Sequence, residues 1–211
     1  MNKLHKRIFE ISYKYQLSHI GSCITAVDII DEIYNIKEEN EPFCLGNSHA
    51  ALALYVILEK YYGFNAEKLY EKHGTHANRS ISEKIFISGG SLSIVESIAL
   101  GFAISNQQKN VYLLSSDGTT TEGLFWETLR IAADNNILNL KWFINANGFS
   151  AYDAIDINKL KIRIKAFTLN SKLNVEIINT NMNKYPVWLS NIHGHYVILD
   201  FKKYQELYEK K

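Results

Sequence analysis

Two polar segments of this chain could bind a charged ligand. The segment SSDGTTTEG contains Asp117 and Gly118, and the segment FINANG contains Asn145 and Asn147. Asp117 offers carboxylate oxygens, and either Asn145 or Asn147 offers an amide oxygen, which are ligands that suit a hard cation such as Mg²⁺ or Ca²⁺. Gly118 leaves room for backbone N–H groups to approach an anion. The two segments therefore predict a site for a metal ion that itself carries a diphosphate group.

The elements around these segments would bring them together. The short apolar stretches at 111–115 and 140–146 read as buried strands, and the helix-like residues 122–136 lie between them. A strand, crossover helix and strand form a parallel, right-handed unit. Both polar segments would then lie at the carboxyl edge of an open α/β sheet, where such folds bind ligands. The alternative is two simple tight turns, which Asp-Gly and Asn-Gly favour by themselves; the helix and the spacing favour the metal site.

The spacing also resembles a known motif. Asp117 and Asn147 are 30 residues apart, since 147 − 117 = 30. This resembles the cofactor-binding motif of thiamine-diphosphate enzymes, in which Gly-Asp-Gly and a helix precede an Asn at similar spacing. Further segments resemble transketolases in the right order: HIGSCITAVDIIDEIY at 19–34, NSHAALALYVILEKYYGF at 47–64, GGSLSIVESIALGFAI at 89–104 and EGLFWETLRIAA at 122–133. The resemblance covers roughly residues 5–150 and is closest to the amino-terminal, diphosphate-binding domain of transketolase.

This resemblance implies a ligand set for the metal. Transketolase-like enzymes bind Mg²⁺ through the residues that match Asp117, Asn147 and the backbone carbonyl of Phe149. Two diphosphate oxygens and a water would complete the octahedron that Mg²⁺ prefers. Gly118 and Thr119 would supply the backbone contacts to the diphosphate.

The resemblance also assigns roles to several histidines. His19 matches a histidine that faces the reacting carbon, His49 matches one near the diphosphate and substrate, and His76 matches the next more loosely. Such histidines can bind sugar hydroxyls and move protons near neutral pH. The alternative is that they are ordinary surface or core histidines. His5 and His73 have no supporting context.

Three other positions match residues around the cofactor or the subunit interface. Glu122 matches a glutamate that reaches the interface and helps to position the partner's activating glutamate; alternatively, it is an acidic residue in the first turn of a helix. Gly90 and Leu92 match positions that flank the cofactor rings.

The sequence departs from the family pattern at three glycine positions. Ser93 and Val95 replace glycines of the family's Gly-Ser-Leu-Gly-Gln-Gly, and Ser116 replaces the first glycine of Gly-Asp-Gly. Added side chains restrict close backbone packing, so cofactor geometry or substrate access could differ from ordinary transketolases.

His193-Gly194-His195 lies where family members carry a later histidine that contacts diphosphate. On a strand, the two imidazoles would face the same side and could bind a metal. No further Cys or acidic ligand supports that metal site, and the role of His193 and His195 stays open.

Length and composition predict one α/β domain over residues 1–211, a three-layer sandwich with a mainly parallel sheet. The chain is 46% apolar and 21% charged, with a net charge of +1, so it offers no global attraction to nucleic acid or to an anionic membrane. It has neither a signal-peptide core nor a run near the ~20 apolar residues of a membrane span. Cys23 and Cys44 lack metal-ligand spacing, so we expect reduced thiols and a cytoplasmic protein.

The remaining pattern predicts further elements. Helices are expected at 3–17, from an N-cap at Thr25 to about Ile36, at 48–62, from Ser91 or Ser93 to about Ile104, and at 158–167. Residues 65–83 read as a loop with a short helix. Strands are expected at 174–178, 186–190 and 196–201, followed by a short charged tail.

The resemblance finally implies that this chain is half of an enzyme. Activating thiamine diphosphate requires a carboxylic acid against the pyrimidine and an apolar, aromatic wall, which in the family come from a second domain. We therefore expect a separate subunit with the pyrimidine-binding and carboxy-terminal domains, in an α₂β₂ assembly. The pair would transfer a two-carbon ketol unit from a ketose donor to an aldehyde or ketone sugar, with free, phosphorylated or nucleotide-linked acceptors all open. The alternatives are a decarboxylating 2-oxo-acid ligase of the deoxyxylulose-phosphate synthase type and a degenerate, non-catalytic paralogue that binds a partner.

Overall fold

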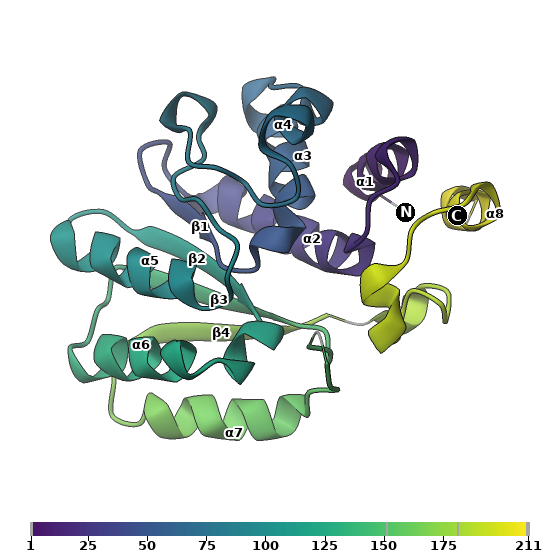
Figure 1. Ribbon diagram of the computed structural model, residues 1–211. Helices are drawn as coiled ribbons and strands as arrows, with labels where there is room; N and C mark the ends of the chain where they lie inside the picture. Colours follow the sequence, from purple (N-terminus) through teal and green to yellow (C-terminus); the bar gives the residue numbers. More distant parts are fainter. Residues whose placement is uncertain (1, 151, 181, 210–211) are drawn as a thin grey trace.

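A four-stranded parallel sheet organises the chain in the computed structural model, which describes residues 2–150, 152–180 and 182–209 (Figure 1). The strands lie in the order β1-β2-β3-β4. They are β1 (Phe43–Leu45), β2 (Val111–Ser116), β3 (Leu140–Ala146) and β4 (Asn174–Asn179). The helices are α1 (Lys3–Tyr15), α2 (Ile20–Ile36), α3 (Ala51–Tyr62), α4 (Ala66–His73), α5 (Ile94–Ser105), α6 (Gly123–Asp134), α7 (Ile157–Phe167) and α8 (Phe201–Glu209). Short 3-10 helices are η1 (Ser48–Ala50), η2 (Ile81–Glu83), η3 (Gly118–Thr121), η4 (Met182–Lys184) and η5 (Ile192–Tyr196).

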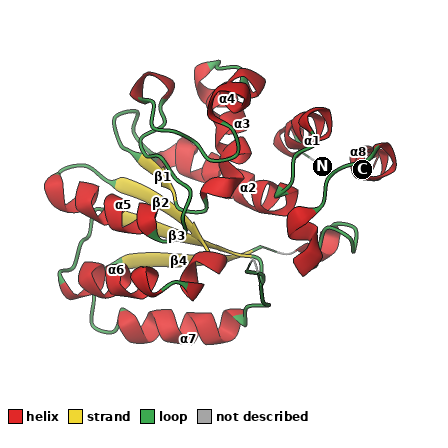
Figure 2. Ribbon diagram, in the orientation of Figure 1, coloured by secondary structure: helices red, strands yellow, loops and turns green. Residues whose placement is uncertain are grey.

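Successive residues of the central strands point to opposite faces of the sheet and so enter two separate cores. In β2, Tyr112 and Leu114 join a core with α1, α2 and α3, whereas Val111 and Leu113 join a second core with α5, α6 and α7. Figure 2 shows these helices on either side of the strands. The predicted α/β fold with helices on both faces of the sheet is confirmed, and the sheet is parallel throughout.

The central unit follows the sequence prediction closely. β2 and β3 pair in parallel, from Val111 opposite Leu140 to Ser116 opposite Asn145, with α6 between them along the chain. The expected helices at 3–17, 48–62 and 158–167 are present as α1, η1 with α3, and α7. The strand expected at 174–178 is β4, and the short helix within 65–83 is α4.

Two predictions in the amino-terminal half were wrong or incomplete. Helix α2 begins at Ile20, not after an N-cap at Thr25. Thr25 is instead buried in the second turn, where its hydroxyl lies 3.0 Å from the Gly21 carbonyl oxygen. Strand β1 was not predicted, because its three residues are too few to show a period.

The last quarter of the chain differs most from the prediction. Residues 186–190 form a turn and 197–200 an irregular segment, so neither expected strand exists. Both lie beyond β4, which ends the sheet order. The charged tail is helix α8, which packs on α1 through the stacked rings of Tyr13 and Tyr204, 4.5 Å apart.

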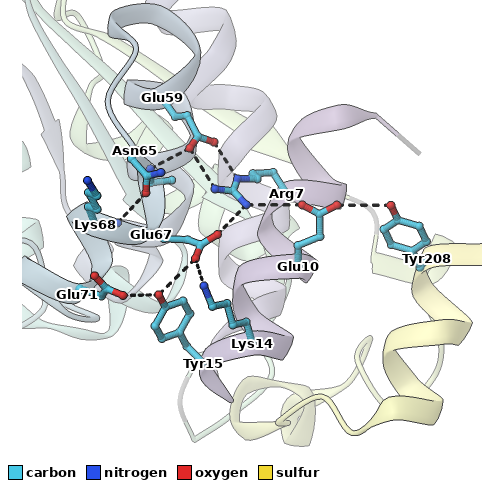
Figure 3. A network of polar contacts seen from close by, with 11 residues as sticks. Arg7, Glu10, Lys14, Tyr15, Glu59, Asn65, Glu67, Lys68, Glu71 and Tyr208 are labelled. Atoms are coloured by element: carbon cyan, nitrogen blue, oxygen red, sulfur yellow. Dashed lines mark hydrogen bonds and ion pairs between the residues drawn. The ribbon is translucent and has the colours of Figure 1, made fainter.

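A network of ion pairs fastens α1 to the neighbouring helices (Figure 3). Arg7 donates to both carboxylate oxygens of Glu59 on α3, at 2.9 and 3.2 Å, and to Glu67 on α4 at 3.1 Å. Lys14 also pairs with Glu67. The fork geometry of Arg7 makes this the most specific contact of the network, and it fixes the layer on which the amino terminus of α2 rests.

None of the helices in the described part of the chain combines the length and apolar character needed to cross a membrane. Cys23 and Cys44 are both buried and free.

Candidate functional site

A cavity of about 170 Å³ opens at the carboxyl ends of the strands. Seven parts of the chain line it: the turn after β2, the turn after β3, the start of α2, η1, the loop after α4, the loop before α5, and the segment that contains η4 and η5. The predicted site residues in its lining are His19, His49, His76, Gly90, Leu92, Asp117, Gly118, Asn147 and Phe149. No Lys or Arg occurs among the described residues of the lining.

Asp117 follows β2 directly and is fully buried. One carboxylate oxygen accepts from the Gly118 N–H at 3.0 Å, and the other accepts from the Gly148 N–H at 2.6 Å. Burial raises the pKa of Asp117 to about 7, although these backbone donors act in the opposite direction. A cation at the cavity would offset the cost of ionising this carboxyl group.

The turn after β3 brings two more oxygen atoms to the cavity. The Asn147 side-chain oxygen accepts from the Phe149 N–H at 2.9 Å, and Gly148 between them has a φ of +88° that few other residues adopt. The Phe149 carbonyl lies beside the Asp117 turn. Its oxygen is 3.9 Å from the position that a Cβ atom would occupy on Gly118. Asn145, the other candidate amide, is outside the lining, because its side chain binds Thr25 and Thr180 instead.

Three histidine rings from distant parts of the chain meet in the lining of the same cavity. The centroid of His19 lies 5.3 Å from that of His49 and 4.4 Å from that of His195, and His49 and His195 are 5.4 Å apart. The backbone N–H of His19 also donates to the backbone carbonyl of His195 at 3.0 Å. His19 adopts a left-handed backbone conformation with a φ of +63°, which is uncommon outside glycine and concentrates at functional sites.

Each predicted histidine has a serine hydroxyl as partner. Ser18 lies 2.7 Å from His19 Nδ1, Ser22 lies 3.2 Å from His49 Nε2, and Ser48 lies 3.2 Å from His76 Nδ1. A hydroxyl can donate to one ring nitrogen tautomer and accept from the other, so these pairs fix ring position without fixing the charge.

Burial keeps the histidine cluster uncharged. It lowers the pKa of His19 to about 4, with further lowering from the charges of His195 and His76. Burial likewise lowers the pKa of His49 to about 3 and that of His195 below its usual value. These rings are therefore neutral at pH 7, and each presents one donor and one acceptor.

Comparison with known proteins agrees with this geometry. The sequence is 26% identical over 139 residues to the 1-deoxy-D-xylulose-5-phosphate synthase of Cutibacterium acnes, covering 63% of this chain and 22% of that protein. It is 25% identical over 165 residues to one subunit of the apulose-4-phosphate transketolase of Phocaeicola vulgatus, covering 69% of this chain and 58% of that protein. The chain is similar in sequence to these members of the transketolase family. No protein-family model matches it.

Solved transketolases share the fold. A Pichia stipitis transketolase mutant in complex with fructose 6-phosphate superposes with a TM-score of 0.79 at 16% identity, covering 98% of this chain and 40% of that one. The Campylobacter jejuni transketolase gives 0.68 at 16% identity, covering 98% and 43%. This chain thus spans less than two thirds of the relatives it matches, in both sequence and structure.

One departure from the transketolase pattern has a structural explanation. Ser93 stands where the family has glycine, and it keeps a glycine-like φ of +68°. Its buried hydroxyl donates to the Thr119 carbonyl at 3.1 Å. The fold therefore retains the backbone turn that precedes α5, while Val95 packs in the core beneath it.

Two predicted residues lie outside the lining of this cavity. Thr119 is buried, and its N–H donates to the Ser116 hydroxyl at 3.3 Å. Glu122 is exposed and occupies the N-cap position of α6 without a capping hydrogen bond from its side chain. Their proposed contacts to diphosphate and to a partner remain predictions.

The His-Gly-His segment forms the 3-10 helix η5, not a strand. Its two histidines therefore do not share a face: His195 lines the cavity and His193 is exposed. Across the described chain, no group of three or more His, Cys, Asp or Glu could hold a metal.

Sequence reasoning left two parts of the site unassigned. His195 was visible in its motif, but nothing in the sequence placed it beside His19. The apolar wall formed by Met182, Leu189 and Ile192 had no signal, because these residues lie where strands were expected or outside any expected element.

Proposed function

We propose that this chain is the diphosphate-binding half of a thiamine-diphosphate-dependent ketol transferase, completed by a separate chain. The observation that carries the proposal is the cavity itself. Its lining combines a buried carboxyl group with a cluster of neutral histidines, and its described residues include no cationic side chain. The first half suits a metal ion with its anion, and the second suits a polar, uncharged substrate.

The residues present fit a magnesium–diphosphate group. Asp117 would give one carboxylate oxygen, Asn147 its amide oxygen and Phe149 its carbonyl, a set of hard oxygen donors that leaves positions for phosphate and water. Burial raises the pKa of Asp117, and a cation bound beside this carboxyl group would lower that pKa again. Thiamine diphosphate supplies a stabilised carbanion for ketol transfer when bound, and this chain would hold and orient its charged end.

The histidines would act on the sugar. Neutral imidazoles can accept a proton from one hydroxyl and donate to another, and their serine partners can follow by rotating. His19 and His49 lie closest to this task because both rings line the cavity and contact each other. His76 is placed to assist through Ser48, and the wall of Met182 and Leu189 excludes water from that side.

Two observations support a second chain. The Phocaeicola vulgatus relative is named as a subunit, and this chain spans 58% of it. In addition, the exposed apolar side chains of Ile94, Tyr152 and Tyr196 each lie within two residues along the chain of a position that lines the cavity. A pyrimidine-binding domain docked there would bury these side chains and supply the activating carboxylic acid. Glu122 would lie at that interface, and an α₂β₂ assembly would place one site at each contact.

The direct test is to mix this chain with a candidate partner that carries the pyrimidine-binding and carboxy-terminal domains, add thiamine diphosphate and Mg²⁺, and measure ketol transfer from ketose phosphates. We expect transfer only with both chains present. A stable pair that binds no cofactor would contradict the proposal.

A second candidate is a decarboxylating ligase, favoured by the similarity to the Cutibacterium acnes 1-deoxy-D-xylulose-5-phosphate synthase. Offering pyruvate in place of the ketose separates the two, because only the ligase releases carbon dioxide. A degenerate, non-catalytic paralogue would bind the partner yet turn over neither donor.

A further inference from the structure

Asn145 on β3 forms hydrogen bonds to the Asp117 turn through its backbone and to Thr25 and Thr180 through its side chain. It is 1% exposed and lies at the sheet edge opposite Ser116. Its backbone carbonyl accepts from the Asp117 N–H at 3.0 Å. Its side-chain amide donates to Thr25 Oγ1 at 2.9 Å, and its side-chain oxygen accepts from Thr180 Oγ1 at 2.7 Å.

Thr25 carries this contact into the histidine cluster. Its hydroxyl lies 3.0 Å from the Gly21 carbonyl and 3.2 Å from the Ser22 carbonyl, in the first turn of α2. Gly21 and Ser22 both line the cavity, and the Ser22 hydroxyl lies 3.2 Å from His49 Nε2. An unbroken path of hydrogen bonds and backbone therefore runs from the Asp117 turn to His49.

Each side-chain polar atom along this path has at least one hydrogen-bond partner. The Asn145 amide nitrogen can only donate, so the Thr25 hydroxyl accepts from it and donates its own proton to a carbonyl of α2. The Asn145 oxygen in turn takes the Thr180 proton. Such a satisfied buried network has one arrangement, which makes it suited to holding two elements at a fixed separation.

We propose that Asn145 is a positioning residue, which with Thr25 holds the first turn of α2, and so Ser22 and His49, in register with the Asp117 turn. Its consequence for catalysis rests on the proposed function, but the geometric coupling does not. Asn145 touches neither substrate nor cofactor. It sets the distance between the charged and the uncharged halves of the cavity.

The test is a mutant cycle on the full chain, read by NMR of the histidine side chains. Asp117→Ala should shift the His49 ring signals in the wild-type background. In the Thr25→Val background the same change should shift them at least twofold less. Thr25→Ser keeps the hydroxyl and should restore the wild-type response.

Thr168→Val is the matched control. The Thr168 hydroxyl also donates to the carbonyl four residues before it, at 2.9 Å from Ile164 O, but it lies at the end of α7 and has no link to Asn145. It should leave the response unchanged. If Thr25→Val does not fold, Thr180→Val removes the other bond of Asn145 from a half-buried position and should weaken the response in the same direction.

In the two-chain complex, Thr25→Val should lower kcat for ketol transfer about tenfold, because small misplacement of reacting groups is costly, while cofactor affinity and KM stay near wild type. Equal His49 shifts in both backgrounds would overturn the coupling. A wild-type complex that binds no cofactor, together with a reduced shift in Thr25→Val, would overturn the proposed function and leave the coupling standing.

Discussion

The two halves of the cavity are built in different ways. The Asp117 half comes from one local unit, in which β2, α6 and β3 follow each other and end in the turns that carry Asp117, Asn147 and Phe149. The histidine half joins residues from the start of α2, from η1 and from η5 near the carboxyl terminus. A compact motif supplies the carboxylate half of the cavity, and long-range packing supplies its histidine half.

Burial acts on both halves with opposite sign. It raises the pKa of Asp117 to about 7 and lowers that of His49 to about 3, so both groups favour the uncharged form. The two halves differ in the partners that their titratable groups require. Asp117 needs a cation before it can be fully ionised at neutral pH, whereas the histidines already have neutral hydroxyl partners.

The largest predicted effect comes from a substitution that disrupts only the Asp117 half of the cavity. Asp117→Ala should weaken Mg²⁺-dependent binding of thiamine diphosphate to the two-chain complex by at least about 100-fold, because it removes the only carboxylate from the proposed metal ligands. Calorimetric titration measures this loss. Asp153→Ala, at an exposed side chain beyond the turn that follows β3, should bind as wild type. Equal affinities for all three proteins would remove Asp117 from the metal site.

The next largest effect comes from a substitution that disrupts only the histidine half of the cavity. His19→Ala should lower kcat for ketol transfer by about 10- to 100-fold, in the range of positioned proton-transfer groups, and leave cofactor affinity within a few-fold. Steady-state kinetics with saturating cofactor separate the two effects. A parallel loss of cofactor affinity would show that the halves are not functionally distinct.

A glycine substitution can damage the histidine half through packing only. A Cβ on Gly89 would lie 2.3 Å from Ser48 Cβ, so Gly89→Ala must displace the segment that carries Ser48 and His49. We expect a loss of about 1–3 kcal/mol in unfolding free energy. Gly101→Ala on α5 has open space and should gain about 0.5–1 kcal/mol, because alanine favours helices. Urea denaturation of both variants tests the pair, and equal stability would contradict the close packing.

The smallest predicted effect is on pH dependence. His49 binds a proton in the unfolded chain near pH 6.5 but in the folded chain only near pH 3. The unfolded state therefore binds more protons between these values, and stability falls as pH falls below 6.5. His49→Gln should reduce this slope by about 1 kcal/mol per pH unit. Urea midpoints at pH 5, 6 and 7 measure it, and the difference isolates His49 because Asp117 is common to both proteins. Parallel profiles would contradict a neutral, buried His49.

The same contrast explains how much could be predicted from the sequence. Apolar runs and glycine turns predict β2, α6 and β3, because local sequence determines these elements. The residue types alone left Asn145 and Asn147 equally possible, and only the family resemblance selected Asn147. The side chain of Asn145 is bonded to Thr25, which lies within α2 although the sequence pattern predicted it as an N-cap.

The histidine half was only partly predictable. His19 and His49 could be named, but their contact with His195 depends on how residues 182–200 fold beyond the edge of the sheet. That segment has strand-like composition without a strand to pair with, so tertiary context overrides its propensity.

The central claim is that this chain holds half of a cofactor site. Calorimetric titration of thiamine diphosphate, with Mg²⁺ present, into this chain, its partner and their complex tests it most directly. The account predicts one cofactor bound per copy of this chain in the complex, and much weaker binding to either chain alone. Full-affinity binding by one isolated chain, or no binding by the complex, would contradict it.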